Sequence, residues 1–545
     1  MPIRARSACA AVCLFLVSAP LALADLSIKA SPDGPRDAVT SPVETEWTYS
    51  IDGGKTFAAD APVVTKGQQQ EVVLRGVFHV DDPEKVAGLY LRHEGKSAVV
   101  CTGQRRQMMI KVWHFNQGIE NTRVTLGGKP LTGSVATTCY YWMPLDPSGL
   151  ISKGKNTLEV RGTFFNATLP EPAKLFPKLA AAVPQAPKIL HGPVLGSLDA
   201  EYFSVTCKTG APAKVTVRAT DAARPESATT ASSGGGYYHR LKIPLPKGAR
   251  KVSYRVTAEL AGKKSTVGPF SFHLPRGPAG HLKFVVIGNT RCHHLYTKHT
   301  GPKLAAAMLA QKPDLFLHAG QVSEFPWWDF YWEPAFFEPY RKLVRTVPTY
   351  LVGPEFREHS GGAKAIFYTP ASEGHARTWT QVIQGVRIIA IDGIQDWSAA
   401  SNNTKWLDTV LSESKEKYVF VFDHFPGYAS GKLSRPPLFR PMAQAREVIH
   451  PLLAKHKATA LISACEFEYE RSEPKGDKGV PQIVIGGGGA KYYAQSGRAT
   501  RNNPFIKVYH RRHGFCLFEV QGEKCLMRAI DIDGVEMDRR TFAPR

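Results

Sequence analysis

Short apolar runs that end in glycine and polar residues organise the second half of the chain. The first run, residues 283–288 (KFVVIG), is followed by the polar tip Asn289, Thr290 and Arg291 and then by a helix-like stretch over residues 303–311. An unbroken run of β-branched and aromatic residues predicts a strand that is buried on both faces, as in a parallel sheet. Because α/β proteins place their chemistry at the carboxyl ends of such strands, this tip is the first candidate functional position.

The same succession of apolar strand and polar tip follows five more times, with helix-like spacers between the runs. These runs are residues 313–321 (PDLFLHAGQ), 346–356 (TVPTYLVGPEF), 417–428 (KYVFVFDHFPGY), 458–471 (ATALISACEFEYER) and 481–490 (PQIVIGGGGA).

This order of strands and tips resembles the calcineurin-like metallophosphoesterases, and the purple acid phosphatase branch in particular, over about residues 283–538. The resemblance implies an α/β metallophosphoesterase-like sandwich over residues 281–545, with the tips surrounding two divalent metal ions. In that family the tips read GD, GD, GNH, a His two residues before a Pro, and GHxHxYER.

Most of the metal ligands that the resemblance implies are replaced in this chain. The first Asp of the family corresponds to Asn289, the metal-bridging Asp to Gln321 and the Asn of the third tip to Pro354. The two histidines of the last tip correspond to Cys465 and Phe467.

Other positions of the motifs are partly retained. The catalytic His of the family corresponds to Glu355, so the resemblance leaves no assigned catalytic residue. His424, two residues before Pro426, is kept, and so is the sequence Tyr-Glu-Arg at residues 469–471.

Two divalent ions held a few ångströms apart need anionic oxygens to offset their repulsion and imidazoles to complete each shell. Asn289 and Gln321 bring no charge, and the side chains of Pro354 and Phe467 cannot bind metal. We therefore expect no cofactor. The predicted function is that of a non-hydrolytic binding or scaffold protein, a pseudoenzyme with the fold of a phosphatase.

Two alternatives stay open for this site. Oxygen, nitrogen and thiolate donors can all bind transition ions, so a single zinc, iron or manganese ion could support a phosphatase or phosphodiesterase with a substituted site. The donors for it would be Asn289, Glu355, Asp423, His424, Cys465 and Glu466. For a site that only binds a ligand, the candidate residues are Arg291, His293, Gln321, Glu355, His424 and Glu466.

Residues 1–24 have the order of a secretory signal. Two arginines precede an apolar stretch over residues 8–17, and a small-x-small pattern ends at Ala24. We expect cleavage before Asp25 and export to the periplasm or the outside of the cell. The alternative, an uncleaved anchor, has an apolar stretch well short of the ~20 residues that a membrane span needs. Residues 25–46 are expected to be a tether.

Alternating patterns predict two β-sandwiches before the α/β domain. Residues 47–169 carry short alternating segments in an order that resembles the galactose-binding-like jelly rolls. A linker rich in Ala and Pro is expected at residues 170–187. Residues 188–276 resemble the fibronectin-III-like domain that precedes the catalytic domain in purple acid phosphatases. Within them, the Ser/Gly-rich residues 227–236 are expected to join two strands as a loop.

Two aromatic clusters allow either a carbohydrate platform or core packing, and packing is favoured because aromatic residues dominate such cores. The first cluster is Trp113, Tyr140, Tyr141 and Trp142, and the second is Trp327, Trp328, Tyr331, Trp332, Phe336 and Phe337.

The formal net charge is +22, which favours attraction to anionic partners, such as phosphorylated envelope polymers or lipid headgroups, although the basic residues are spread along the chain. No basic cluster is long enough to predict specific nucleic-acid binding. Nine cysteines include two in the predicted signal, and the seven that remain are an odd number. We expect Cys101 and Cys139 to form a disulfide and Cys465 to stay a buried thiol.

Overall fold

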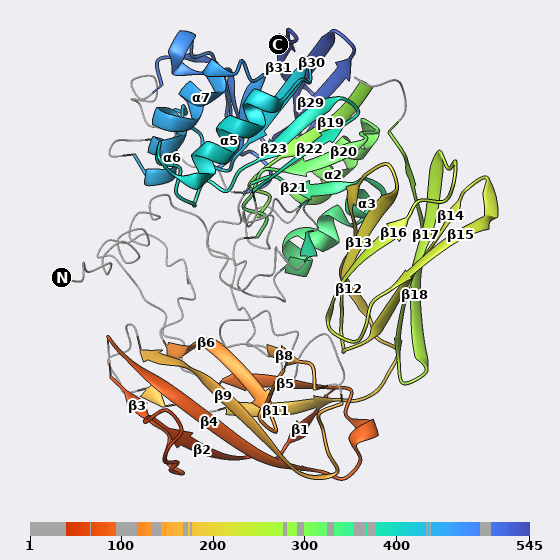
Figure 1. Cartoon of the computed structure of the whole chain (residues 1–545), viewed down its shortest axis with the longest axis vertical. Coiled ribbons are helices and arrows are strands. Elements are labelled where there is room, and N and C mark those ends of the chain that lie inside the picture. The colour runs from red at the N-terminus through yellow and green to blue at the C-terminus, as the bar shows by residue number, and fades with distance from the viewer. Residues whose placement is uncertain are drawn as a thin grey trace.

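The structure, a computed structural model, describes residues 40–65, 67–93, 117–131, 143–147, 149–166, 173–174, 177–275, 281–291, 299–323, 332–353, 366–367, 370, 378–431, 434, 438–490 and 503–545. Within these ranges the chain folds into three β-rich units that follow one another in sequence (Figure 1). No helix of this part of the chain is both long and apolar enough to cross a membrane. The predicted signal, Cys101, Cys139, His293, Pro354 and Glu355 lie outside the described residues.

The first unit is a sandwich of two antiparallel sheets with the strand orders β1-β11-β5-β8 and β2-β4-β9-β6-β7. Every second residue of β9 from Asn156 to Phe164 is buried, which places Leu158 and Val160 in a common core. The elements are β1 (Thr40–Val43), β2 (Glu46–Ser50), β4 (Gln68–Val80), η2 (Pro83–Lys85), β5 (Gly88–His93), β6 (Gln117–Leu126), β7 (Lys129–Pro130), β8 (Met143–Leu145), β9 (Gly154–Asn166) and β11 (Pro177–Ala182), with β3 (Val63–Val64) and β10 (Ala173–Lys174) as a separate pair.

Two segments that were expected to be a tether and a linker contain strands of this sandwich. β1 lies within residues 25–46, β11 lies within residues 170–187, and the two strands pair with each other. β11 also pairs with β5, and its small residues Ala180 and Ala182 are buried. Pro177 is the first residue of β11, a position at which a strand tolerates proline. Composition alone therefore misjudged these segments, because small residues can still form a buried face.

The second unit is a sandwich of a three-stranded sheet, β12-β13-β16, and a four-stranded sheet, β15-β14-β17-β18. Buried residues alternate strictly with exposed or half-buried ones along β14, and Val215 and Val217 face the core between the sheets. The strands are β12 (Ile189–Leu198), β13 (Tyr202–Thr209), β14 (Lys214–Asp221), β15 (Arg224–Ser232), β16 (Tyr238–Pro244), β17 (Lys251–Leu260) and β18 (Lys263–His273).

Residues 227–232 belong to β15, so most of the loop expected at residues 227–236 is a strand. β15 is the edge of its sheet and pairs with β14. Its side chains are exposed or half-buried, so the strand needs few apolar residues. A strand with so few apolar residues shows no alternation of hydrophobic and polar positions in the sequence, and for this reason the segment was predicted to be a loop.

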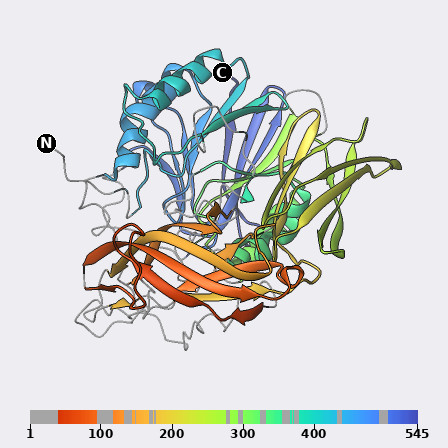
Figure 2. The ribbon, with the colours of Figure 1, turned by 60° about the horizontal axis from the view of Figure 1, so that its bottom comes forward.

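The third unit contains two sheets that pack face to face, with helices on their outer sides (Figures 1 and 2). The first sheet has the order β21-β20-β19-β29-β30-β31 and the second has the order β22-β23-β24-β25-β27-β26-β28. Its strands are β19 (His281–Ile287), β20 (Leu315–His318), β21 (Thr349–Leu351), β22 (Trp379–Ile383), β23 (Val386–Ala390), β24 (Tyr418–Phe422), β25 (Ala460–Ser463), β26 (Tyr469–Ser472), β27 (Gln482–Ile485), β28 (Ile506–His510), β29 (Gly514–Gln521), β30 (Lys524–Asp531) and β31 (Glu536–Phe542).

The helices of the third unit cover both sheets. On the first sheet, α2 and α3 share a core cluster with Val285 and Ile287 of β19. On the second sheet, α5 and α7 share another cluster with Val419 and Val421 of β24. The helical elements are α2 (Thr300–Ala310), the π-helical η4 (Glu333–Phe337), α3 (Glu338–Thr346), α5 (Asn402–Glu413), α6 (Arg440–Gln444), the π-helical η6 (Ala445–Ile449), α7 (His450–Lys455) and η7 (Gly476–Lys478).

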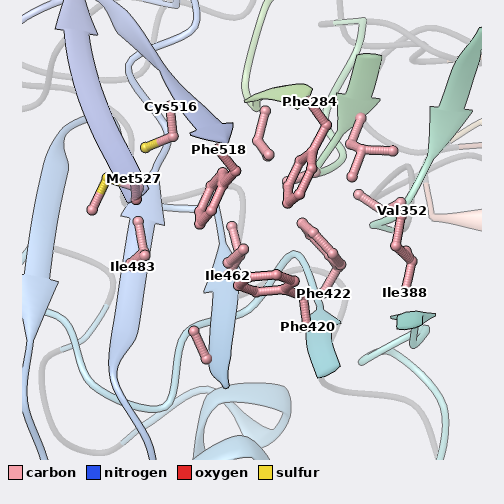
Figure 3. Close-up of a cluster of buried hydrophobic side chains, with 14 of the residues drawn as sticks. Phe284, Val352, Ile388, Phe420, Phe422, Ile462, Ile483, Cys516, Phe518 and Met527 are labelled. Atoms are coloured by element: carbon pink, nitrogen blue, oxygen red, sulfur yellow. The ribbon is translucent and has the colours of Figure 1, made fainter. Parts of the chain in front are cut away.

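Aromatic and aliphatic residues together fill the space between the two sheets (Figure 3). The rings of Phe284 in β19 and Phe518 in β29 stack with their centroids 4.7 Å apart. Phe420 of the second sheet meets Phe518 edge-on at 5.2 Å. This core joins residues from opposite ends of the unit and fixes how the two sheets face each other.

Three residues of the second aromatic cluster are buried, which confirms the packing prediction for them. Trp332, Phe336 and Phe337 lie in the cluster beneath α3. Trp327, Trp328 and Tyr331, like the aromatic cluster expected in the first sandwich, lie outside the described residues.

The second unit contacts both neighbours through buried groups. Tyr90 of β5 donates a hydrogen bond to the carbonyl of Gly210 at 2.7 Å. On the other side, the N–H of Leu198 donates to the hydroxyl of Tyr350 at 2.9 Å. Arg345 of α3 donates to the carbonyl of Gly192 at 2.7 Å. The last two of these bonds hold β12 against the third unit.

Candidate functional site

The polar tips of both sheets in the third unit meet at one edge. β19, β20 and β21 run parallel in one sheet, and β23, β24, β25 and β27 run parallel in the other. Backbone and side-chain hydrogen bonds join their carboxyl ends: the N–H of Asn289 donates to the carbonyl of Gly320 at 3.0 Å, and Nδ1 of His424 lies 2.9 Å from the carbonyl of Ala319. The described tips that the sequence predicted therefore lie next to one another at one edge of the two sheets.

Four non-glycine residues at these tips have positive φ. The values are 52° for Asn289, 28° for Arg291, 54° for Gln321 and 60° for Cys465. Side chains rarely adopt this conformation, and such strain clusters where the surrounding structure holds a functional geometry in place. The backbone therefore has this rare left-handed conformation at three of the tips.

Asn289 is fully buried and is oriented by two carbonyl groups. Its Nδ2 donates to the carbonyl of Glu466 at 3.4 Å and to that of Gly486 at 3.3 Å. Oδ1 then faces away from these carbonyls, and it has no hydrogen-bond partner among the described residues. A Cβ at Gly486 would lie 1.6 Å from the carbonyl oxygen of Glu466, so only glycine permits this close approach of strand ends.

His424 is fully buried and neutral. Its Nδ1 faces a carbonyl, which can only accept, so Nδ1 carries the proton and Nε2 carries a lone pair. Burial lowers the pKa of His424 to about 4. Nε2 has no hydrogen-bond partner among the described residues.

His318 lies at the end of β20 and is also neutral, because burial and the nearby His424 lower its pKa to about 3. The N–H of Gly320 donates to Nδ1 of His318, so Nε2 carries the proton and faces the hydroxyl of Thr290 at 3.1 Å. His318 thus ties the tips of β19 and β20 together, a role that the sequence did not suggest.

Arg291 and Gln321 form a contact that the sequence did not predict. Nη1 of Arg291 donates to Oε1 of Gln321 at 3.3 Å. The guanidinium carbon lies 5.3 Å from the centre of the Phe467 ring, within range of a cation–π interaction. The site therefore contains a positive side chain next to the residue that corresponds to the metal-bridging Asp of the resembled family.

Cys465 is a buried thiol with no disulfide, as predicted. Burial raises its pKa well above the usual value, with further contributions from Glu466 and Asp423. It packs with Phe425 and Met442 in a small apolar cluster. Its sulfur is therefore a protonated, apolar group.

Of the three carboxylates predicted for the site, Glu355 lies outside the described residues, while Glu466 and Asp423 each accept hydrogen bonds from the protein through one oxygen. Oε1 of Glu466 accepts a hydrogen bond from the hydroxyl of Ser434 at 2.9 Å. Oδ1 of Asp423 accepts from the N–H groups of Gly393 and His424. Burial and the neighbouring Asp392 raise the pKa of Asp423 well above its usual value.

The described residues do not fit a pair of divalent metal ions. They contain no group of three or more His, Cys, Asp and Glu side chains that could hold one metal ion. Gln321 already accepts from a guanidinium, and Phe467 presents a ring to the same cation. Nε2 of His424 and the neutral Oδ1 of Asn289 are available, but two uncharged donors are too few for the shells of two divalent ions.

The retained Tyr-Glu-Arg sequence has a structural role in this chain. The hydroxyl of Tyr469 and the guanidinium of Arg471 both donate to Asp538 of β31, at 2.6 Å each. Glu470 accepts from the N–H of Ser430 at 2.9 Å and from Asn503. The first of these networks ties the second sheet to the last strand of the first sheet, and no motif in the sequence indicated Asp538 as the partner.

Neither a protein-family model nor a curated protein matches this sequence. Among solved structures, it is similar to the purple acid phosphatase PPD1 from yellow lupin (Lupinus luteus) seeds, with 14% identity over 87% of this chain and 93% of that chain and a TM-score of 0.56. A structure of PhoD matches with 12% identity over 64% of this chain and 88% of that chain and a TM-score of 0.47. The first similarity shows that this multidomain, sheet-rich chain has a fold like that of a purple acid phosphatase.

Proposed function

We propose that this chain is a non-hydrolytic member of the metallophosphoesterase superfamily that uses its strand-tip site to bind a ligand. One observation carries this proposal: Arg291 donates to Gln321, at the position where the resembled enzymes bridge two metal ions. A neutral amide that already accepts from a cation cannot offset the repulsion between two divalent ions.

The proposal also agrees with the state of the other tips. Asn289 brings an amide in place of a carboxylate, and Cys465 is protonated by virtue of its burial. Metal-assisted hydrolysis depends on metal ions that lower the pKa of a bound water molecule to ~7, and the described side chains at the tips do not fit such a pair of ions. Binding without hydrolysis is the chemistry that remains.

A second candidate function is a hydrolase that works with one metal ion. It is favoured by three buried side-chain atoms at the tips that have no hydrogen-bond partner among the described residues: Oδ1 of Asn289, Nε2 of His424 and Oδ2 of Asp423. A zinc, iron or manganese ion there would act as a Lewis acid toward a phosphate ester. His424 would hold it, with its proton on Nδ1 already placed to leave Nε2 available.

Elemental analysis of the purified protein after dialysis against zinc, iron and manganese tests the two candidates. We expect no stoichiometric metal pair and no turnover of an aryl phosphate or an aryl phosphodiester. Restoring Asn289→Asp and Gln321→Asp together is expected to leave the protein inactive, because the ligands corresponding to Cys465 and Phe467 are still missing. Retained metal together with turnover that is lost in His424→Ala would establish the hydrolase instead.

We further propose that residues 1–24 are removed on export and that the mature chain begins at Asp25, with two β-sandwiches ahead of the third unit, which is called the phosphatase-like unit below (β19 to β31). The charged, apolar and small-x-small order of these residues supports this. The intact mass of the protein recovered outside the cytoplasm tests it, and a mass that includes the leader would contradict it.

A further inference from the structure

The outer face of the β15-β14-β17-β18 sheet in the second unit has two arginines at its centre. Val215 and Val217 of β14 point into the sandwich, so the residues between and beside them, among them Arg218, point away from it. The register of β14 and β17 sets Arg255 directly opposite Arg218. Both arginines are exposed, and this sheet lies on the outside of the molecule (Figures 1 and 2), where a large partner can reach it.

This arginine pair has no carboxylate to offset its repulsion. Residues directly opposite each other have Cβ atoms about 5 Å apart, and like charges at such positions destabilise a sheet. No acidic side chain of the described residues forms an ion pair with Arg218 or Arg255, and Nη1 of Arg255 donates only weakly to the carbonyl of Gly268, at 3.5 Å. Glu259, four residues along β17 from Arg255, already pairs with Lys264 at 3.4 Å.

A similar pair of arginines in the phosphatase-like unit is neutralised by the protein itself. Arg528 of β30 lies directly opposite Arg539 of β31. Arg528 pairs with Glu519 at 3.2 Å, and Arg539 pairs with Glu536 at 2.8 Å. The pair in the second unit lacks such partners among the described residues, so it lowers the stability of its sheet, and a bound anion would remove that repulsion.

A row of hydroxyl groups crosses the same face beside the arginine pair. Thr216 of β14 lies directly opposite Thr257 of β17, two residues from each arginine. The hydroxyl of Thr216 lies 2.8 Å from that of Ser232 in β15. The hydroxyl of Thr257 lies 2.9 Å from that of Thr266 in β18. A hydroxyl group can both donate and accept, so this row suits the hydroxyl groups of a sugar chain.

The composition of this face distinguishes between classes of anionic partner. The outward-facing positions of β14, β15, β17 and β18, all of them described, include no Phe, Tyr, Trp, Leu, Ile or Val. Elements that lie on a lipid surface bury apolar side chains in it. Sites for single-stranded nucleic acid stack the bases on aromatic side chains. A face of arginines and hydroxyl groups instead fits an acidic polysaccharide.

We propose that this face binds an acidic polysaccharide. Arg218 and Arg255 hold carboxylates of the polymer through charge-assisted, two-point hydrogen bonds, and the hydroxyl row binds its sugar hydroxyl groups. Lys214 lies four residues from Arg218, and Lys251 lies four residues from Arg255 toward the opposite end of the sheet, each about 14 Å along its strand. The positive charge therefore extends far enough for a polymer. This surface belongs to a different unit from the strand-tip site and does not depend on the chemistry there.

Titration calorimetry of the full-length protein with polygalacturonate, a polymer with a carboxylate on each sugar, tests this proposal. Binding is expected, and it should weaken as the salt concentration rises, because salt screens exposed charges. The double variant Arg218→Gln/Arg255→Gln is expected to bind at least about tenfold more weakly, as loss of charge-assisted contacts does. Absence of binding by the unaltered protein, or unchanged binding by the double variant, would overturn the proposal.

Arg240→Gln/Lys242→Gln is the matched control. Both residues belong to β16 of the same unit and are exposed on the outer face of the other sheet. Their removal changes the net charge by the same amount and should leave polygalacturonate binding unchanged. Equal weakening by the two double variants would show that only overall charge matters and would overturn the proposal.

Thermal unfolding distinguishes a binding role of the arginines from a structural one. Because the two like charges repel, the melting temperature of Arg218→Gln/Arg255→Gln should equal or exceed that of the unaltered protein. Arg218→Glu sets opposite charges across the strands and should also leave the protein at least as stable, while it weakens polygalacturonate binding by at least about tenfold. A clear fall in melting temperature for both variants would show that the arginines support the fold and would overturn the proposal.

Three other probes test the class of partner: neutral dextran, vesicles of phosphatidylglycerol and a short DNA duplex. Each is expected to bind more weakly than polygalacturonate at the same salt concentration. Dextran lacks the carboxylates, and the vesicle and the duplex lack the alternation of carboxylate and sugar hydroxyl groups. Vesicles or DNA that bind as tightly as polygalacturonate, with the same loss in Arg218→Gln/Arg255→Gln, would overturn the assignment of an acidic polysaccharide.

Discussion

Replacing Asp538 by alanine should substantially destabilise the phosphatase-like unit. Asp538 accepts from Nε of Arg471 at 2.6 Å, from its Nη2 at 3.2 Å and from the hydroxyl of Tyr469 at 2.6 Å. The side chains of Arg471 and Asp538 are only 12% and 8% exposed, so solvent screens this ion pair weakly. Removing Asp538 would leave a largely buried cation and a buried hydroxyl with fewer partners.

The expected loss is about 3 kcal/mol of unfolding free energy, since breaking a buried ion pair from one side costs ~3–5 kcal/mol. The low end applies because Arg471 keeps a second partner, Glu473 at 2.5 Å. For a folding unit of ~250 residues this corresponds to a fall in melting temperature of about 6–12 °C.

The pH dependence gives a second readout. Burial opposes ionisation of Asp538, but hydrogen bonds from Arg471 and Tyr469 outweigh it and hold the pKa below its usual value of 3.8. A carboxyl group with a lowered pKa stabilises the folded state above its usual pKa and loses that contribution as the pH falls through the folded value. The difference between the wild type and Asp538→Ala should therefore be complete at neutral pH and shrink below about pH 4.

Differential scanning calorimetry measures both effects, and Asp408→Ala is the control. Asp408 pairs with Lys455 at 2.9 Å and with His456 at 2.5 Å, but Asp408 itself is 41% exposed and Lys455 is 60% exposed, so solvent screens its charge. An exposed pair contributes about 0–1 kcal/mol, so the control should shift the melting temperature little. If Asp538→Ala behaved like Asp408→Ala, or if its effect grew in acid, the argument for a stabilising link between the sheets would be refuted.

Three further results are expected. Gly486→Ala should prevent folding of the phosphatase-like unit or lower its free energy of unfolding by more than about 3 kcal/mol, because the added Cβ would overlap the carbonyl of Glu466. A melting transition like that of the wild type would contradict this. Glu333→Gln should destabilise the protein on the order of 2 kcal/mol at neutral pH, because burial raises the pKa of Glu333 but His191 and Arg341 outweigh it and lower the pKa to about 2. The stabilities of the wild type and the variant should converge in denaturation curves as the pH falls from about 4.5 toward 2, and a constant difference would count against this. Cys465 should react with iodoacetamide only after denaturation, since it is buried as a protonated thiol, and rapid labelling of the native protein, seen by peptide mass mapping, would disprove this.

The strands of the phosphatase-like unit could be read from the sequence because they are buried on both faces. The run at residues 283–288 became β19, and the runs that contain Gln321, His424 and Cys465 became β20, β24 and β25. An unbroken apolar run is a local property of the sequence, and a polar tip after it marks where the strand ends. The meeting of the tips followed from this pattern.

The contacts of the site could not be read in the same way. The bond from Arg291 to Gln321 depends on positive φ at both residues, and neither is a glycine that would announce such a conformation. The partner of Arg471 is Asp538, which reaches it only because β31 lies beside the second sheet. Such partners are set by the packing of distant segments, and spacing along the chain contains no signal for them.

The stacking of Phe284 on Phe518 also has a consequence for how the chain reaches its native state. β19 is the first strand of the phosphatase-like unit, yet its neighbour β29 lies almost at the end of the sequence. The central pairing of the first sheet cannot form until residues 288–513, which separate β19 from β29, have also been synthesised, and pairing of such distant segments makes folding slow. The two sandwiches ahead of it have their own cores and can fold earlier, while the phosphatase-like unit exposes apolar strands for longer and is the part most in need of chaperones.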